Sequence, residues 1–442
     1  MTIENSGPAR LTPADSSNGR RPESLPRFRF SATSERSSLS PHQPRRPPTA
    51  ASSVMPTTIL DLPLEVTEDI FLRLDDAADV ARVAAACRSH RSVVRNRRFL
   101  RRYRFLYPPP VLGFLQDSMG NTGFLHADEP HKSAPAAASL LAEEADFGFS
   151  FLPTDPNGNY GSRSWRVRDA RDGRVLLSRR SADDSATFLD LVICDPVYRR
   201  YDEIPPIPED LWTKRYSAKM KSEPFLLPAR EEEDESQFRV IYNWMCKYKI
   251  ITFLFNSDSR IWSVGTSLSL LLPERLIYDP MEFVRHYVGT CFYWVHQRVP
   301  HYMIVLDPVE MEFSITRLPY VTGDMLIGLA VVDAAEVNRL GIIGLGYESN
   351  LHLYSKQIGG STEEWRHDKD HTLPEDYKHC HIIGASEGCL VLENYSVEIA
   401  QYFIMDPKTF LIERFCKGKQ QYAAEHALPY ARFPPSLSAP SI

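Results

Sequence analysis

The residues of this sequence that are most able to do chemistry are gathered in two short runs, 367–371 and 379–381, which together hold seven potential metal ligands. They are His367, Asp368, Asp370, His371, His379, Cys380 and His381. Imidazole, thiolate and carboxylate groups are the usual ligands of Zn²⁺ and similar ions. However, residues 367–371 surround a lysine and end before Leu373-Pro374, which is typical of a solvated loop, and residues 379–381 begin a strand whose alternate side chains face opposite sides. We therefore expect no metal site, and a site for a divalent metal is the alternative.

Several sequence motifs of enzymes are absent. The chain has no P-loop, no H-E-x-x-H zinc motif and no G-x-G-x-x-G after a strand. The paired carboxylates of a glycosidase need no sequence motif, so a carbohydrate-acting enzyme remains an alternative. We expect a chain with no catalytic residues and no cofactor.

Composition and charge argue against several classes of protein. The 442 residues carry a net charge of −6 and have a pI near 6.1, which gives no general reason to bind nucleic acid or anionic lipid. The seven cysteines never occur as Cys-x-x-Cys, so neither a disulfide framework nor a zinc ribbon is indicated. The apolar run Leu268–Leu272 is far too short to span a bilayer. A cytoplasmic or nuclear location, or both, fits best.

The length predicts two folded units plus a tail. Residues 1–55 are rich in Ser, Pro and Arg and cannot bury enough apolar surface to offset the entropy of ordering, so we expect them to be disordered. An organelle transit peptide is the alternative for this segment. Residues 421–442 are expected to form a flexible C-terminal tail.

Three helices are predicted between Ile59 and Tyr103. Four apolar residues recur every four positions and so share one stripe of the first helix: Leu62, Val66, Ile70 and Leu74. Asp61 is a possible N-cap, and Pro63 falls in the first turn, where its missing N–H removes no intrahelical bond. A second short helix has Asp79 as a possible cap or first-turn acid, and a third, basic helix runs from Ser89 to about Tyr103. Three such helices form a small core, so an apolar face left over for a partner is reasonable.

This helical segment resembles an F-box, the motif that docks substrate-receptor subunits onto the Skp-type adaptor of cullin ubiquitin ligases. The resemblance rests on ordered steps in the sequence: Leu62-Pro63-x-Glu65-Val66, Ile70-Phe71-x-Arg73-Leu74, Asp79-Val80-x-x-Val83 and Cys87-Arg88-Ser89. One position departs from the pattern, because His90 stands where many members have Trp. The resemblance implies that seven residues contribute to adaptor contact or to the core beneath it: Leu62, Pro63, Val66, Ile70, Leu74, Val80 and Val83.

From Val111 onward, short strand-like runs separated by Gly, Pro, Asn and Asp predict an all-β domain. Three segments resemble one another, because each has a strand that starts at Gly and a hydrophobic strand that ends in Asp-Pro. They are 172–196, 289–308 and 387–407. The Asp-Pro steps lie 112 and 99 residues apart, about twice the length of a four-stranded propeller blade, so another blade is expected between each pair.

Two segments are candidates for these intervening blades, Phe238–Trp262 and Leu326–Trp365, since both contain three strand-like runs. Residues Val111–Trp165 could supply a sixth blade, completed by a C-terminal strand around Leu411–Phe415, because propellers often close their ring in this way. The whole chain is thus predicted to be multidomain. A small all-α F-box at 56–106 is followed by an all-β repeat domain at 107–420, which we interpret as a β-propeller of about six blades. A β-sandwich or an α+β domain is the alternative.

An F-box followed by such repeats is similar to the plant F-box proteins, especially those of grasses, that carry a C-terminal F-box-associated, propeller-like domain. This resemblance implies a non-catalytic substrate-recognition subunit of a Skp–cullin–F-box ubiquitin ligase. Its partners would be a Skp-type adaptor, cullin through that adaptor, and an unknown substrate protein held by the β domain, with no nucleic acid and no membrane. A protein-binding scaffold outside any ligase and a carbohydrate-acting propeller enzyme are the alternatives.

Overall fold

The computed structural model of the chain describes most of residues 62–432. The described ranges are 62–118, 121–142, 145–154, 165–179, 188–211, 220–230, 236–246, 248–270, 282–296, 301–319, 326–334, 336, 338–358, 364–386, 388–394, 399–419 and 427–432. The expected disordered segment 1–55 and the expected N-cap Asp61 lie outside these residues.

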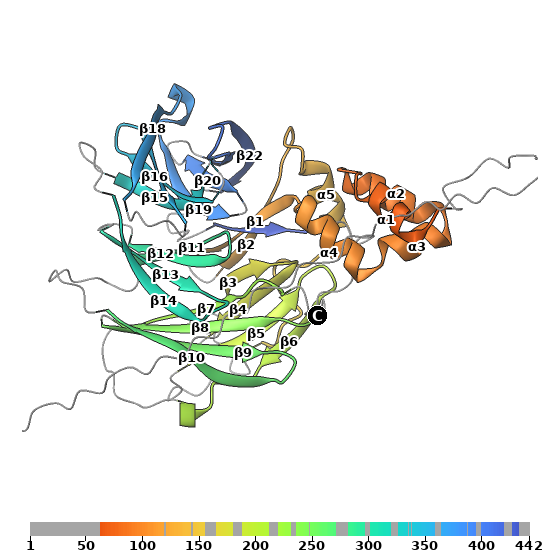
Figure 1. The fold of residues 1–442 in the computed structure, drawn as a ribbon, viewed down its shortest axis with the longest axis horizontal. Coiled ribbons are helices and arrows are strands. Elements are labelled where there is room, and N and C mark those ends of the chain that lie inside the picture. The colour runs from red at the N-terminus through yellow and green to blue at the C-terminus, as the bar shows by residue number, and fades with distance from the viewer. Residues whose placement is uncertain are drawn as a thin grey trace, which may run out of the picture. The chain divides into compact units, whose positions relative to one another are not determined.

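The N-terminal part is all-α, as predicted, with helices α1 (Leu64–Phe71), α2 (Ala77–Ala86), α3 (Arg88–Val94) and α4 (Arg97–Leu106) (Figure 1). The third predicted helix is divided in two at Asn96. The side chain of Asn96 accepts a hydrogen bond from the Arg98 N–H at 2.9 Å, which caps α4 and favours a new helix start at this point. Asp76 caps α2 in the same way, through the Ala78 N–H at 2.8 Å.

The four helices share one hydrophobic core. Its fully buried members include Phe71 from α1, Val80 from α2, Val94 from α3, and Phe99 and Tyr103 from α4. The rings of Phe99 and Tyr103 stack with their centroids 5.9 Å apart. Each helix therefore contributes at least one large apolar side chain to the same small core.

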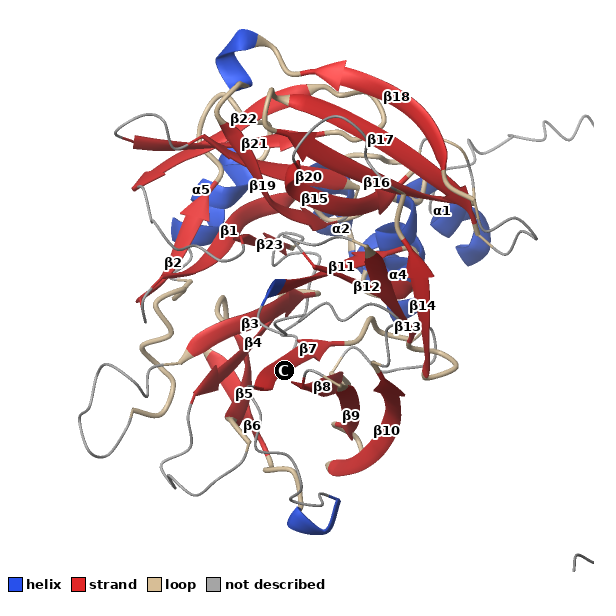
Figure 2. Cartoon of the chain, turned by 90° about the vertical axis from the view of Figure 1, so that its left-hand side faces the viewer, coloured by secondary structure: helices blue, strands red, loops and turns tan. Residues whose placement is uncertain are grey.

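Among the residues that the structure describes after α4, the strands form six antiparallel sheets, five of them with four strands (Figures 1 and 2). The first two are β3 (Arg166–Arg171), β4 (Arg174–Arg179), β5 (Asp190–Asp195) and β6 (Arg200–Ile204), then β7 (Met220–Leu226), β8 (Arg239–Cys246), β9 (Lys249–Asn256) and β10 (Ile261–Ser269). The next two are β11 (Phe283–Val288), β12 (Cys291–His296), β13 (Tyr302–Asp307) and β14 (Glu312–Arg317), then β15 (Leu326–Asp333), β16 (Arg339–Gly346), β17 (Asn350–Gln357) and β18 (Arg366–Thr372). The fifth is β19 (Cys380–Ser386), β20 (Cys389–Asn394), β21 (Ile399–Met405) and β22 (Ile412–Lys419).

The sixth sheet joins the two ends of this domain. Strands β1 (Val111–Ser118) and β2 (Asn121–His126) are completed by β23 (Ala427–Ala431), which pairs antiparallel with β1. The first strands of the five four-stranded sheets follow one another around a ring. In the sixth sheet the edge strand β23 takes this place, because it contacts both β3 and β19. Between β7 and β11 the link includes a hydrogen bond of 2.6 Å from Lys221 Nζ to the carbonyl of Phe283. The domain is a six-bladed β-propeller.

Two details of the predicted domain are corrected. The strand that closes the ring is β23, because residues 412–419 form β22 within the preceding blade. The β domain therefore extends past residue 420, and part of the expected flexible tail is a strand with Ala427 and Tyr430 buried. The chain also inserts a helix, α5 (Ala134–Ala142), which contacts β1 and β2 and buries Ala137 and Leu140.

The core of the propeller lies between neighbouring blades. Phe225 of β7 meets Trp294 of β12 with ring centroids 5.8 Å apart, and both side chains are buried. Leu345 of β16 and Leu392 of β20 share another cluster, between the last two four-stranded sheets. Each of these sheets thus presents apolar side chains to a neighbour, as face-to-face sheet packing requires.

The predicted Asp-Pro corners form the turns between the third and fourth strands. In these turns Asp195, Asp307 and Asp406 each accept a hydrogen bond from the N–H two residues on, at 3.1, 2.8 and 2.7 Å. The residue four positions after each aspartate has a positive φ. Asn256 does the same in the β9–β10 turn, where it accepts from the Asp258 N–H at 2.9 Å, so a fourth blade uses this turn without the Asp-Pro sequence.

Among the described residues, no helix is both long and apolar enough to cross a membrane.

Candidate functional site

The first candidate site is the outer surface of α1. Thr67 and Phe71 form the buried side of this helix. Three large apolar side chains of α1 are nonetheless exposed: Leu64, Val66 and Ile70 have 58%, 44% and 37% of their surface in solvent. We call these three residues the α1 apolar surface. An eight-residue helix that buries one side and exposes aliphatic groups on the other has a surface available to a partner.

The seven predicted site residues fall into two groups. Pro63, Val66 and Ile70 are exposed, and Leu62, which precedes α1, is half-buried. Val80 is completely buried, and Leu74 and Val83 pack against the helical core. The first group is available for contact, whereas the second supports the helices from beneath.

Leu64 was missed by the sequence pattern because it lies outside the four-residue repeat of the stripe. It is nonetheless the most exposed large apolar residue of α1. The sequence could have indicated its exposure, because Pro63, Leu64 and Val66 lie within four positions and cannot all face one small core.

His90 occupies the position at which the motif departs from the F-box pattern. Its ring lies edge-on to Phe71, with centroids 5.1 Å apart and planes at 80°. The imidazole therefore packs against Phe71 as an aromatic side chain would. Within the described part of the chain, neither ring nitrogen of His90 has a hydrogen-bond partner, and both are shielded from solvent.

Charged groups join α4 to α1. Arg102 of α4 donates to Glu68 Oε1 at 2.6 Å and to Asp69 Oδ1 at 3.3 Å. The hydrogen bond to Glu68 is the main factor that raises the pKa of Arg102. One member of the basic run on α4 is thus used within the helical unit itself.

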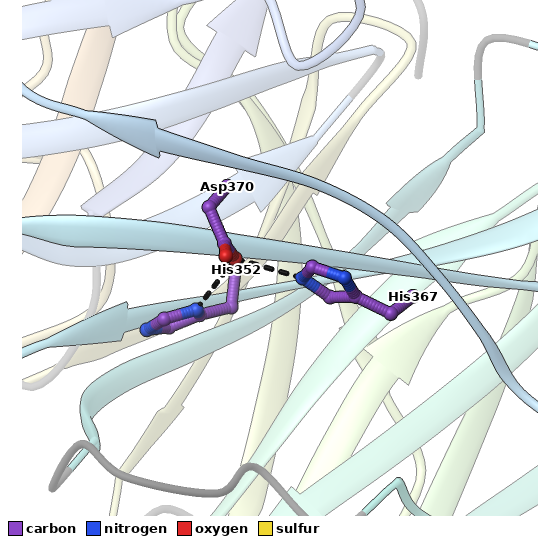
Figure 3. A group of neighbouring side chains, drawn as sticks. All are labelled: His352, His367 and Asp370. Atoms are coloured by element: carbon purple, nitrogen blue, oxygen red, sulfur yellow. Dashed lines mark hydrogen bonds and ion pairs between the residues drawn. The ribbon is translucent and has the colours of Figure 1, made fainter.

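The second candidate site lies on the sheet formed by β15–β18. Residues 366–372, expected to be a loop, form the edge strand β18. Here His352 Nδ1 and His367 Nε2 lie 2.8 and 2.7 Å from the same atom, Asp370 Oδ1 (Figure 3). Contacts from His367 and then His352 lower the pKa of Asp370 below its usual value, so this carboxylate is ionised at neutral pH.

The other predicted ligands lie elsewhere. Cys380 is buried at the start of β19, and burial raises the pKa of its thiol to about 12, which disfavours the thiolate that binds metals. His371 stacks on Phe410, with ring centroids 4.7 Å apart. A cavity of about 470 Å³ lies on the opposite face of this sheet, where Leu353, Lys369 and Phe410 line it.

Carboxylates on the first strands of the blades are engaged in structural contacts. Arg285 of β11 lies 3.2 Å from Asp169 of β3 and 3.6 Å from Glu223 of β7. Asp169 also accepts from the Leu226 N–H at 2.8 Å, and Glu223 accepts from the indole N–H of Trp294 at 2.7 Å. These groups tie three blades together.

One spacing typical of a nucleophile was missed in the sequence. Residues 384–388 have the order G-x-S-x-G. In a hydrolase this motif is a strand-to-helix elbow that exposes the serine. Here Ser386 pairs with Cys389 at the end of β19, so the motif lies in a hairpin between two strands and has no helix behind it.

Comparison with known protein families addresses the helical unit directly. Residues 59–106 match the F-box-like family. The match spans all four helices, so an F-box-like helical unit precedes the six-bladed propeller in this chain. F-box domains in general bind Skp-type adaptors. No curated protein shows a significant sequence match.

Comparison with solved structures returns distant likenesses. A mutant of the Aleuria aurantia lectin, in complex with alpha-methyl-L-fucoside, is 10% identical, with a TM-score of 0.34 over 60% of this chain and 81% of that one. The periplasmic gluconolactonase PpgL of Pseudomonas aeruginosa is 10% identical, with a TM-score of 0.35 over 74% and 100%. The GH93 α-L-arabinofuranosidase of Fusarium graminearum is 10% identical, with a TM-score of 0.33 over 61% and 82%. Likenesses at this level carry no argument about activity.

Proposed function

We propose that this chain is the substrate-recognition subunit of a Skp–cullin–F-box ubiquitin ligase. In this role the α1 apolar surface contacts a Skp-type adaptor, and the propeller holds a target protein. The observation that carries the proposal is the α1 apolar surface, three exposed aliphatic side chains on an F-box whose own core is already complete. Removing them from water favours association by about 25 cal/mol for each Å² of apolar surface buried.

The proposed contribution to ubiquitin transfer is positional. A receptor that holds a target beside a charged conjugating enzyme replaces a bimolecular encounter with an effectively intramolecular one. No residue of this chain needs to take part in the chemistry. The proposal extends to a non-catalytic protein of the plant, grass-type F-box class that acts in the cytoplasm or nucleus, and it rests there on the sequence resemblance.

Affinity purification of the full chain from plant cells with the proteasome blocked tests this function. We expect the Skp-type adaptor and cullin to co-purify, together with ubiquitin-modified targets. The variant Val66→Ala/Ile70→Ala, which truncates two residues of the α1 apolar surface, should lose adaptor and cullin while its propeller keeps its targets. The matched control Val309→Ala changes an exposed aliphatic residue of the propeller and should retain both.

Three outcomes separate the alternatives. Recovery of the adaptor without cullin would favour a scaffold that works outside a ligase. Undiminished adaptor recovery by Val66→Ala/Ile70→Ala would overturn the assignment of the α1 apolar surface as the docking surface. Hydrolysis of an oligosaccharide by the purified chain would favour the enzyme alternative.

A further inference from the structure

Three metal-binding side chains converge on the outer strands of the β15–β18 blade. The nearest ligand atoms of His352, His367 and Asp370 all lie within 4.8 Å of one another. Figure 3 shows both imidazole rings directed toward the Asp370 carboxylate from either side. His352 is half-buried, whereas His367 and Asp370 are exposed, so an ion could reach the group from solvent.

A β-bulge is the reason that these residues share one face. His352 and Asp370 are direct partners across β17 and β18, and His367 is paired with Tyr354. In a regular strand, residues three positions apart face opposite sides. The register shifts between Leu353 and Tyr354, so the extra residue Asp368 on β18 reverses the alternation and brings His367 onto the side of Asp370. Bulges of this kind are frequent next to functional sites.

The donor set indicates the class of ion. Two imidazoles and one carboxylate suit Zn²⁺ and neighbouring transition metals, whereas Mg²⁺ and Ca²⁺ favour sites made only of oxygen. Zn²⁺ bonds of about 2.0–2.2 Å at tetrahedral angles place ligand atoms about 3.3 Å apart. The two nitrogen-to-oxygen distances of 2.8 and 2.7 Å lie close to this value, and partly exposed side chains can open by the difference.

We propose that His352, His367 and Asp370 form a three-ligand site for a divalent transition-metal ion of the Zn²⁺ class. When the ion binds, His352 Nδ1 and His367 Nε2 lose their contacts with Asp370 and bind the ion in the unprotonated form. The Asp370 carboxylate binds the ion through an oxygen atom. Three protein ligands leave a fourth position open to water or to a side chain of another molecule. The site is independent of adaptor docking.

The test uses the full chain, purified without a polyhistidine tag, treated with a chelator and titrated with Zn²⁺ against a chromophoric competitor. Because the seven free cysteines could also bind Zn²⁺, the decisive quantity is the difference between wild type and variants. We expect His352→Gln/His367→Gln to lose one equivalent of Zn²⁺. Asp370→Asn, which keeps the shape of the side chain, should weaken that equivalent at least about tenfold.

The matched control is His126→Gln, which removes an exposed histidine 3.6 Å from Asp128 where no third ligand is present among the described residues. This variant should bind Zn²⁺ as wild type does. Co²⁺ gives a second measurement, because a tetrahedral site shows visible absorption bands that Asp370→Asn should diminish. Equal Zn²⁺ stoichiometry and affinity in wild type and in both triad variants would overturn the proposal, as would the absence of any Zn²⁺ binding by wild type.

Discussion

The two folded parts of this chain differ in where they leave apolar side chains exposed. In the propeller, neighbouring blades bury strand residues against each other, as Phe225 packs against Trp294, and the exposed aliphatic residue Val309 lies in a turn. In the F-box, α1 buries Phe71 but leaves Val66 and Ile70 in solvent. A closed ring needs no further partner for its core, whereas a four-helix unit of about forty residues is too small to use all of its apolar surface. The exposed residues of α1 therefore support the proposed adaptor interface, while the residues buried between the blades stabilise the ring.

The largest expected effect is on the closure of the ring. Arg432 follows β23, and its guanidinium lies 2.9 Å from Asp195 of the neighbouring blade, with side chains only 3% and 0% exposed. Arg432→Ala leaves that carboxylate buried without this cation, and we expect the free energy of unfolding to fall by about 3–5 kcal/mol. Denaturant unfolding of the full chain measures this loss.

The control for Arg432→Ala is another ion pair between blades, Arg260 with Asp202, at 2.7 Å but with side chains 50% and 33% exposed. Solvent screens this pair, so Arg260→Ala should cost less than about 1 kcal/mol. Equal losses in the two variants would show that burial of the Arg432 pair does not stabilise the ring.

The second expected effect separates binding from stability. Val66→Asp/Ile70→Asp places two charges on the α1 apolar surface without changing its buried side. Adaptor affinity should fall at least about 30-fold, which corresponds to the loss of a binding hot spot of about 2 kcal/mol. The free energy of unfolding should change by no more than about 0.5 kcal/mol for each substitution. Titration calorimetry with a purified Skp-type adaptor, together with denaturant unfolding, checks both expectations.

The control Val309→Asp changes a propeller side chain that is 66% exposed and should leave both quantities unchanged. If the α1 double variant unfolds more easily in proportion to its loss of affinity, the α1 apolar surface is a structural element and the contrast with the propeller fails.

The sequence was sufficient to predict the F-box and the number of blades, because both depend on local patterns. A four-residue period identifies the stripe of α1, and the Asp-Pro corners mark alternate blades. Amphipathic spacing does not reveal which side of a short helix is buried. That Val80 is buried and Val66 exposed follows only from the packing of all four helices. Asn256 was missed because it forms the same turn with a different dipeptide.

Two other features depend on pairings that local patterns do not carry. Strand β23 is short and contains Pro429, which is unusual for a strand, and its partner β1 lies about three hundred residues earlier. The His352, His367 and Asp370 triad requires a bulge that no local signal announces, and it takes one ligand from a different strand. Both features arise from long-range strand pairing, which only the folded domain defines.

The smallest expected effect is on the free energy of unfolding when His90, which lies beside the buried side of α1, is replaced. His90 contacts the Phe71 ring but buries two nitrogens without partners among the described residues, and an unsatisfied buried polar group costs about 1–3 kcal/mol. Phenylalanine keeps the ring and removes the polar atoms. We expect His90→Phe to raise the free energy of unfolding by about 1 kcal/mol, with adaptor affinity unchanged, since the α1 apolar surface is not altered.

Hydrogen exchange at the amides of α1 and α3 in the full chain measures the stability of the F-box. The neighbouring exposed substitution Ser89→Ala is the control and should have little effect on exchange. Faster exchange in His90→Phe than in wild type would mean that the imidazole nitrogens are satisfied in solution. In that case the exposed surface of this F-box would include His90 of α3 in addition to the residues of α1.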